Sequence, residues 1–277
     1  MIYTQLELKT LISKYNVESY DAMLLLQYVL GCSYSTVCFS RQIDFSEQQL
    51  EKLRKCLDLR HQGMPVAKII GSKSFYNHKF KTTVDTLDPR PETELIVDLF
   101  QDYFQDKTAP LSILDLGCGT GCIGLSILDL YPNSILCLAD ISSKALAVAR
   151  DNAIALNCFD RCTLVKTDWF KNISNTFDVI VSNPPYISND YSLDRDTLYD
   201  PHIALFGGED GMDAYRNILP VAHKFLQKNG LMFLEIGINQ CNSICELCNK
   251  LKILNIVKDL QGIDRAVVLK ATNQFEH

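Results

Sequence analysis

Hydrophobic positions spaced three and four apart dominate the first seventy residues. LELKTLISKY (6–15), SYDAMLLLQYVLG (19–31) and SEQQLEKLRKCLDLRHQG (46–63) carry this pattern, which predicts amphipathic helices. Ser46 and Gln49 resemble a capping box, and Gly31 and Gly63 stand where helices end. No strand-like alternation precedes residue 66. We therefore expect a helical N-terminal domain over residues 1–72, with no strand before residue 66.

The pattern then changes twice. KSFYNHKFKTTV (73–84) alternates aromatic and polar residues, which predicts a β-hairpin connector over residues 73–86. Beyond residue 110, short apolar runs suit buried strands: LSILDL, SILCLA, CTLVK, FDVIVS, GLMFLEI, LNIVKDL and AVVLKA. Helical patterns such as SKALAVARDNAIALN and AYRNILPVAHKFLQKNG separate most of them. This predicts an α/β domain over residues 87–277, with a mostly parallel sheet covered on both faces.

Composition narrows the function classes. The net charge of −6 over 277 residues argues against a chain whose main task is to neutralise phosphates, so we expect no stable nucleic-acid binding. No signal peptide is apparent, and the most apolar stretch, AMLLLQYVL, is too short to span a membrane. We therefore interpret the eleven cysteines as free thiols in a reducing cytoplasm. The histidines show no metal-ligand spacing. We expect a cytoplasmic monomer without a metal.

A glycine-rich turn marks a cofactor site. ILDLGCGTGCIG lies where the first strand of the α/β domain meets its helix, and Gly117, Gly119 and Gly121 allow close backbone approach to a ligand. Asp140 ends the next strand, where a carboxylate can accept hydrogen bonds from both ribose hydroxyls. The glycine spacing also spells the dinucleotide fingerprint GxGxxG. The turn alone leaves two cofactors possible, a dinucleotide and S-adenosylmethionine. The sequence DLGCGTG favours S-adenosylmethionine.

Asn183-Pro184-Pro185-Tyr186 follows the fourth strand, at the same predicted sheet edge. An amide nitrogen is a poor nucleophile because its lone pair is delocalised. The Asn183 side-chain oxygen and the Pro184 carbonyl could accept its two N–H bonds, and the prolines would stiffen the turn. Tyr186 could lie against the flat face of the group. The tetrapeptide therefore indicates methylation of a planar NH₂ group. An enzyme that transfers a hydride would have no use for this tetrapeptide.

At this point the sequence resembles a known family over nearly its whole length. PRPETE, DWF, NPPYI, GGEDGMDAYR and LEIGINQ together are similar to bacterial release factor glutamine methyltransferases. The resemblance implies a class I S-adenosylmethionine-dependent methyltransferase with a Rossmann-like, seven-stranded, mostly parallel sheet and a small helical N-terminal domain. It also implies methyl transfer to the amide N5 of the glutamine in the Gly-Gly-Gln motif of class I peptide chain release factors, which the N-terminal domain would help to grip.

The resemblance also implies roles for particular residues. The cofactor-binding positions would be Gly117, Cys118, Gly119, Thr120, Gly121, Asp140, Asp168, Trp169 and Asn183. The glutamine pocket would be Asn183, Pro184, Pro185 and Tyr186, of which Asn183, Pro184 and Tyr186 would act in catalysis. Two alternatives stay open: an adenine-N6 methyltransferase acting on DNA or RNA through the same NPPY site, and a noncatalytic binding module of the translation machinery.

Overall fold

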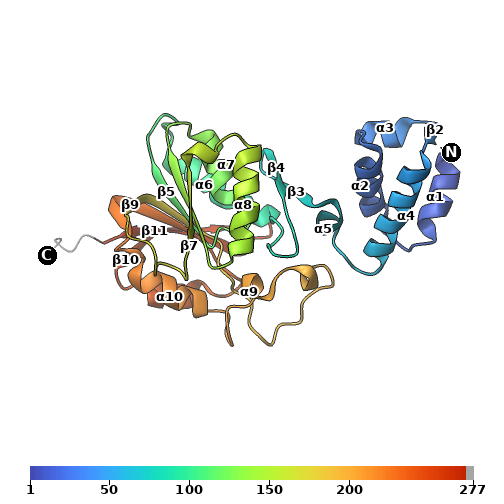
Figure 1. The fold of residues 1–277 in the computed structure, drawn as a ribbon. Coiled ribbons are helices and arrows are strands. Elements are labelled where there is room, and N and C mark those ends of the chain that lie inside the picture. The colour runs from blue at the N-terminus through green and yellow to red at the C-terminus, as the bar shows by residue number, and fades with distance from the viewer. Residues whose placement is uncertain (273–277) are drawn as a thin grey trace. The chain divides into compact units, whose positions relative to one another are not determined.

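A computed structural model describes residues 1–272 and divides the chain into two compact units (Figure 1). The first contains Met1–Ser72 together with the distant segment Leu193–Tyr199, and the second contains Lys73–Ser192 and the chain from Asp200 onward. The chain therefore passes between the units three times.

The first unit is mainly helical. Its helices are α1 (Gln5–Ser13), α2 (Ser19–Leu30), α3 (Tyr34–Phe39), α4 (Glu47–His61) and α5 (Val66–Ile70). As predicted, α4 begins with a capping box, because Ser46 Oγ accepts from the Gln49 amide at 3.1 Å and Gln49 Oε1 accepts from the Ser46 amide at 3.0 Å. Leu25, Leu53 and Leu57 are fully buried in its core.

The expectation of no strand before residue 66 is wrong. The strands β1 (Ile2–Thr4) and β2 (Gln42–Asp44) pair antiparallel. Each has only three residues, too few for a visible alternation. The pairing is supported by tertiary contacts: the N-terminal ammonium donates to the Phe45 carbonyl at 2.6 Å, and the Tyr3 and Phe45 rings meet edge to face.

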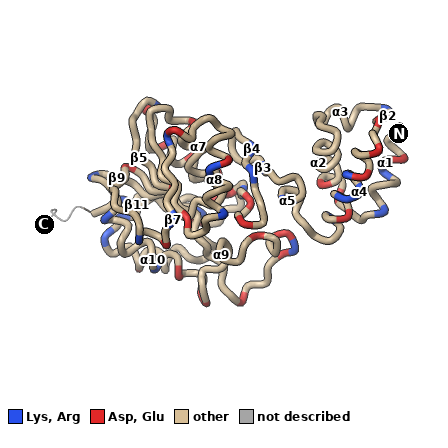
Figure 2. Tube along the Cα trace, in the orientation of Figure 1, with Lys and Arg blue, Asp and Glu red and all other residues tan. Residues whose placement is uncertain are grey.

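Charges of both signs lie along α4 (Figure 2). Lys52, Arg54 and Lys55 are exposed on this helix, between acidic residues. Mixed signs do not build the continuous basic surface that phosphate binding requires.

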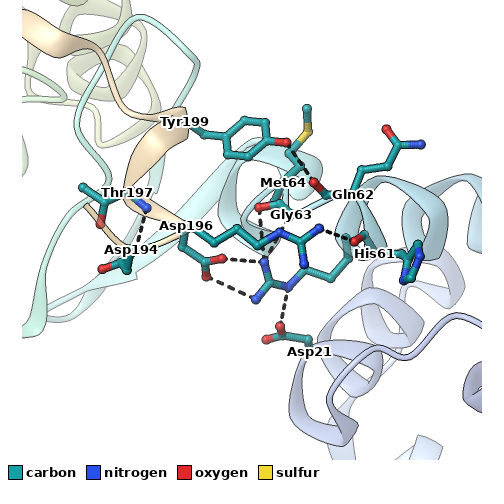
Figure 3. A network of polar contacts seen from close by, with 11 residues as sticks. Asp21, His61, Gln62, Gly63, Met64, Asp194, Asp196, Thr197 and Tyr199 are labelled. Carbon is teal, nitrogen blue, oxygen red and sulfur yellow. Dashed lines mark hydrogen bonds and ion pairs between the residues drawn. The ribbon is translucent and has the colours of Figure 1, made fainter. Parts of the chain in front are cut away.

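The segment Leu193–Tyr199 is held to the first unit by a polar network (Figure 3). The Arg60 guanidinium donates to both carboxylate oxygens of Asp196, at 2.6 and 3.2 Å, and to Asp21 at 2.5 Å. Arg195 donates to the His61 carbonyl, and Tyr199 donates to the Gln62 carbonyl at 3.3 Å. A segment far along the chain thus completes the helical unit.

A glycine permits this approach. Gly63 has a φ of +106°, and a Cβ added there would lie 2.2 Å from Arg195 Nε. Any larger residue would have to push the Arg195 side chain away.

The second unit is built on a seven-stranded sheet, as predicted. Its strands are β5 (Ser112–Leu116), β6 (Ile135–Asp140), β7 (Cys162–Lys166), β8 (Phe177–Ser182), β9 (Leu226–Glu235), β10 (Leu251–Lys258) and β11 (Asp264–Ala271). Their order is β10-β11-β9-β8-β5-β6-β7. The five strands from β9 to β7 are parallel to their neighbours, whereas β11 runs antiparallel to β9 and β10.

Helices cover both faces of this sheet. They are α6 (Glu94–Tyr103), α7 (Cys122–Leu130), α8 (Ser143–Ala155), α9 (His202–Leu205), α10 (Asp213–Ala222) and α11 (Cys241–Leu247), with 3₁₀ turns at Pro91–Thr93, Phe159–Arg161 and, in the first unit, Thr197–Tyr199. Figure 1 shows α7 and α8 on the opposite side of the sheet from α10. Ile113 packs with α6–α8 and Leu114 with α10, so the central strand is apolar on both faces.

The helical pattern after residue 213 extends further than the helix. It continues to Gly230, but α10 ends at Ala222 and β9 already begins at Leu226. The Phe225 carbonyl accepts from the Phe177 amide at 2.8 Å. Pairing with β8 therefore overrides the local helical pattern.

The predicted hairpin is present as β3 (Ser72–Phe75) and β4 (His78–Lys81). Phe75 and Phe80 are buried in the core beneath α6–α8, with ring centroids 6.0 Å apart. Apart from Ser72, the hairpin thus belongs to the second unit.

Two further findings concern residues 1–272 as a whole. No helix there is both long and apolar enough to cross a bilayer. The same residues contain no cluster of three His, Cys, Asp or Glu side chains that could hold a metal ion, and all eleven cysteines are free.

The first prediction concerns Asp196→Ala, which removes the carboxylate held by Arg60. Because the Asp196 side chain is 47% exposed, we expect a loss of about 1 kcal/mol in local stability. Hydrogen exchange of the Thr197 and Tyr199 amides should accelerate about fivefold, while amides within α4 stay protected. Asp190→Ala, which removes a nearby exposed carboxylate, is the control and should leave exchange in this segment unchanged. Equal exchange in wild type and Asp196→Ala would show that the ion pair does not hold the segment.

Candidate functional site

A cavity opens at the carboxyl ends of the parallel strands, entirely within the second unit. It holds about 1330 Å³ of space that no protein atom fills, including the solvent at its mouth. Most of the sequence-predicted site residues line it: Gly117, Cys118, Gly119, Thr120, Asp140, Asp168, Trp169, Asn183 and Pro185. Parallel strands end at one edge, so residues separated by nearly seventy positions in the chain meet there.

The glycine turn after β5 is held by backbone contacts. The Gly117 and Cys118 amides both donate to the Ala139 carbonyl of β6, at 2.8 and 3.0 Å. Gly117 and Gly119 have φ of +74° and +54°, and a Cβ added at Gly119 would meet no atom within 4 Å. The turn thus leaves open space above its backbone, which a ligand can fill.

Gly121 does not line the cavity. It caps the N-terminus of α7 with a φ of +76°, and an added Cβ would come within 3.0 Å of Leu125. Its structural role is therefore to let α7 start closely packed against the sheet.

Asp140 at the end of β6 ties two loops together. One carboxylate oxygen accepts from the Gly119 amide at 2.9 Å, and the other accepts from the Ser142 amide at 2.8 Å. Burial raises the pKa of this carboxyl, whereas the backbone donors lower it. The side chain both shapes the glycine turn and presents acceptor oxygens to the cavity.

Asp115 lies one layer deeper and is 1% exposed. It accepts from the Gly124 amide at 2.9 Å, which secures the start of α7. Burial, together with the nearby Asp140 charge, raises its pKa to about 7, although the Gly124 amide bond lowers it. Asp115 does not line the cavity and serves as a support.

The loop after β7 contributes Asp168 and Trp169. Trp169 has an unusual φ of +50°, and its carbonyl accepts from the Thr167 hydroxyl at 2.9 Å. A Cβ added at Gly117 would lie 3.7 Å from the Trp169 ring, so the glycine turn and the ring are adjacent parts of the cavity wall. Asp168 instead pairs with exposed Lys171 at 2.5 Å, at the rim.

The NPPY loop after β8 lies partly in and partly behind the cavity wall. Asn183 and Pro185 line the cavity, whereas Pro184 and Tyr186 do not. The Asn183 amide nitrogen donates to the Thr93 hydroxyl at 3.1 Å, which leaves the amide oxygen as the free acceptor. The Tyr186 hydroxyl donates to Glu235 at 3.1 Å.

Sequence reasoning assigned no role to the residues that support this loop. A Cβ on Gly207 would lie 2.6 Å from the Pro185 carbonyl, and one on Gly211 would lie 2.2 Å from the Tyr186 carbonyl. Gln240 donates to the same Tyr186 carbonyl at 3.0 Å. GGEDG and LEIGINQ were recognisable as motifs, but only the fold brings them against NPPY.

Comparisons with known proteins agree with this geometry. Residues 9–71 match the family described as PrmC N-terminal domain, and residues 87–197 match the Methyltransferase small domain. The release factor glutamine methyltransferase of Caulobacter vibrioides is 37% identical over 264 residues, which cover 93% of this chain and 91% of that protein. The chain belongs to the release factor glutamine methyltransferase family. The family predicted from the motifs is confirmed.

Some relatives of this family member are longer. The bifunctional methyltransferase of Rickettsia felis is 35% identical over 285 residues, which cover 91% of this chain and 54% of that protein. The chain thus spans about half the length of such curated relatives. Among solved structures, a 16S rRNA N2 G1207 methyltransferase of T. thermophilus in complex with AdoMet and guanosine is similar, with a TM-score of 0.51 and 14% identity over 73% of this chain and 50% of that one. This likeness concerns the fold alone, and the predicted α/β methyltransferase fold is confirmed.

The second prediction concerns the pH dependence of stability through Asp115. The unfolded carboxyl ionises near 3.8, but the buried one only near 7. The contribution of Asp115 to the free energy of unfolding is therefore fully present below pH 3.8 and is lost as the pH rises to about 7. The difference between the two pKa values corresponds to a total of about 4 kcal/mol.

Urea unfolding of wild type and Asp115→Asn across this pH range measures the effect. The stability of the wild type relative to the variant should fall as the pH rises from 4 to 7 and then level off. Asp102→Asn, which removes an exposed carboxyl, should show no such trend. A relative stability that rises over this range would contradict the interpretation.

Proposed function

We propose that this chain transfers a methyl group from S-adenosylmethionine to the side-chain amide N5 of a glutamine. The glutamine is that of the Gly-Gly-Gln motif in class I peptide chain release factors, and the reaction modulates translation termination. The single observation that carries the proposal is one cavity that joins the Gly117 turn, Asp140 and the Asn183 amide.

The residues of the cavity fit S-adenosylmethionine. Gly117 and Gly119 leave room for the methionine part, Asp140 offers carboxylate oxygens for the ribose hydroxyls, and the Trp169 ring forms an apolar wall for the adenine. Cys118 and Thr120 complete the turn, and Asp168 lies beside Trp169 at the rim. When bound, S-adenosylmethionine supplies an electrophilic methyl group on a sulfonium.

The NPPY loop then holds the acceptor nitrogen. Because the Asn183 amide nitrogen is engaged by Thr93, its oxygen can accept one N–H bond of the glutamine amide. We propose the Pro184 carbonyl as the other acceptor. Tyr186, which like Pro184 does not line the cavity, supports the loop from behind the cavity wall through its bond to Glu235. Both acceptors favour the shift of this nitrogen toward tetrahedral geometry. Such positioning can lower a barrier by about 7–11 kcal/mol in the best-aligned cases.

No side chain needs to act as a strong base. A methylated amide nitrogen becomes acidic only after the methyl group has arrived, and its proton can leave to water. The tyrosine beside the site is not suited to this task, since burial raises the pKa of Tyr186. Catalysis by this loop would therefore rest on orientation and on oriented dipoles.

The helical first unit is proposed to help bind the release factor. Its match to the PrmC N-terminal domain supports this role. It also exposes large apolar side chains that a partner could cover: Leu6, Tyr20 and Phe39 are 75%, 70% and 83% exposed. We further propose a monomer that works in the cytoplasm and forms no stable complex with nucleic acid.

Three parallel incubations test the function. The protein is mixed with radiolabelled S-adenosylmethionine and a class I release factor, the same factor with its motif glutamine replaced by alanine, or duplex DNA. Label in the first mixture alone, with mass spectrometry placing one methyl group on the motif glutamine, is the expected result. Label in DNA alone would establish the adenine-N6 alternative instead. No label with any acceptor, together with no cofactor binding by calorimetry, would indicate a binding module.

The third prediction is that Asn183→Ala lowers turnover by several orders of magnitude. The substitution removes an acceptor that orients the glutamine nitrogen, and positioning of this kind accounts for large rate factors. Affinity for S-adenosylmethionine, measured by calorimetry, should change little. Near-normal turnover would refute the account of the pocket.

The fourth prediction separates binding from chemistry. Asp140→Asn replaces a charged acceptor, and hydrogen bonds to charged groups contribute about 1.5–3 kcal/mol each. The dissociation constant for S-adenosylmethionine should therefore rise about tenfold to hundredfold. Asp151→Asn, at an exposed position on α8, is the control. An effect limited to the release-factor KM would contradict the assignment of Asp140 to the cofactor.

A further inference from the structure

One buried side-chain amide holds the end of the NPPY loop (residues 183–186). Gln240, which is 9% exposed, donates from Nε2 to the Tyr186 carbonyl at 3.0 Å and to the Gly211 carbonyl at 3.3 Å. Its Oε1 accepts from the Gly237 amide at 2.9 Å. All three partners are main-chain groups, and they belong to three separate motifs: NPPY, GGEDG and LEIGINQ. The amide therefore joins three segments at one point.

Two glycines make this close approach possible. A Cβ added at Gly211 would lie 2.2 Å from the Tyr186 carbonyl oxygen and 2.8 Å from Gln240 Nε2. A Cβ added at Gly237 would lie 2.6 Å from Gln240 Oε1. Neither position could carry a larger residue unless the neighbouring groups moved. Both glycines thus leave the space that the Gln240 amide occupies.

The main chain of Gln240 is anchored as well. This residue is the N-cap of α11, and its carbonyl accepts from the Ile244 amide at 3.0 Å. Its own amide donates to the Gly237 carbonyl at 3.3 Å. The side-chain amide therefore extends toward the NPPY loop from a fixed point on the segment that follows β9.

The entry of the loop is held separately. Ser182, the last residue of β8, is fully buried, and its hydroxyl donates to the Leu116 carbonyl of β5 at 2.7 Å. Between this anchor and Tyr186 lie Asn183 and two prolines, whose rings fix φ and which have no amide hydrogen to donate. A stiff segment of this kind is placed by its two ends. The exit at Tyr186 therefore decides, together with Ser182, where Asn183 and Pro185 stand in the cavity wall.

We propose that Gln240 is a positioning residue for methyl transfer: it fixes the exit of the NPPY loop and thereby holds Asn183 and Pro185 at their places in the cavity wall. The proposal rests on the proposed function for the identity of the reaction. It gives GGEDG and LEIGINQ a common task, which is to hold the main chain of Tyr186. Gln240 does not itself line the cavity, so it acts through the loop.

The residue after Tyr186 reports on this restraint. The Ile187 amide donates to the Leu205 carbonyl at 2.9 Å, and the Gly207 amide donates to the Ile187 carbonyl at 2.8 Å. These two bonds join the exit of the loop to the start of GGEDG. Because Gln240 ties the same two segments together, loss of its amide should let these bonds open more often.

Three variants test this role. Gln240→Met keeps the length of the side chain but removes both donated bonds and the accepting oxygen. Gln240→Leu is a second apolar variant, used if Gln240→Met does not fold. Arg161→Met is the matched control: Arg161 directly precedes β7, at the opposite end of the strands from the cavity. There its Nη1 donates to three main-chain carbonyls, those of Leu128, Tyr131 and Ser134, at 3.0, 3.1 and 3.1 Å.

In the methylation assay, the Gln240 variants should lower kcat about tenfold to hundredfold, because a small misplacement of the acceptor can cost this much. Their dissociation constant for S-adenosylmethionine, measured by calorimetry, should stay within about twofold of wild type. Arg161→Met should keep near-normal kcat, although it also removes hydrogen bonds to main-chain carbonyls. A normal kcat in a folded Gln240 variant would overturn the proposal, and so would an equal fall of kcat in Arg161→Met.

A second measurement does not depend on activity. Hydrogen exchange of the Ile187 and Gly207 amides should be about tenfold faster in Gln240→Met than in wild type, and unchanged in Arg161→Met. Unchanged exchange in Gln240→Met would overturn the positioning role even if release factors are methylated. Faster exchange in a protein that methylates no release factor would instead support the hold of Gln240 on the loop and refute the proposed function.

Discussion

The shared carboxyl edge of the parallel strands is the constraint on which the site depends. The loops after β5, β6, β7 and β8 all leave the sheet at this edge, because their strands point the same way. No loop forms the cavity alone. The turn at Gly117 supplies space, Asp140 supplies acceptor oxygens, and Asn183 supplies a directed amide. The separation of the glycine turn, Asp140 and Asn183 is thus set by strand spacing rather than by flexible side chains.

Buried acidic groups support this edge from beneath. Asp115 holds the start of α7, and Glu235 holds Tyr186; burial raises the pKa of each to about 7. Such groups reduce the stability of the fold at neutral pH. Stability is often lower at functional sites, where orientation matters more than burial of apolar surface. The glycines of GGEDG also support this edge, since Gly207 and Gly211 allow their own segment to approach the NPPY backbone closely.

The first unit follows a different principle. It is held by an apolar core of helices, yet it includes Leu193–Tyr199, which follows the NPPY loop by only a few residues. Arg60 contacts Asp21 from its own helical region and Asp196 from this distant segment. The helical unit and the loop that carries the proposed chemistry are consequently linked through the chain at more than one point.

Local patterns alone determined much of this protein. Helical periodicity located α1, α2 and α4, apolar runs located the seven strands of the sheet, and short motifs identified Gly117, Asp140 and Asn183, because each of these signals lies within a few consecutive residues. Tertiary structure alone decided the pairing of β1 with β2, the end of α10 at Ala222, and the inclusion of residues 193–199 in the helical unit. It also decided that Thr93, Glu235 and Gln240 contact the NPPY loop. These features depend on contacts between residues far apart in the chain, and a local sequence pattern does not predict such contacts.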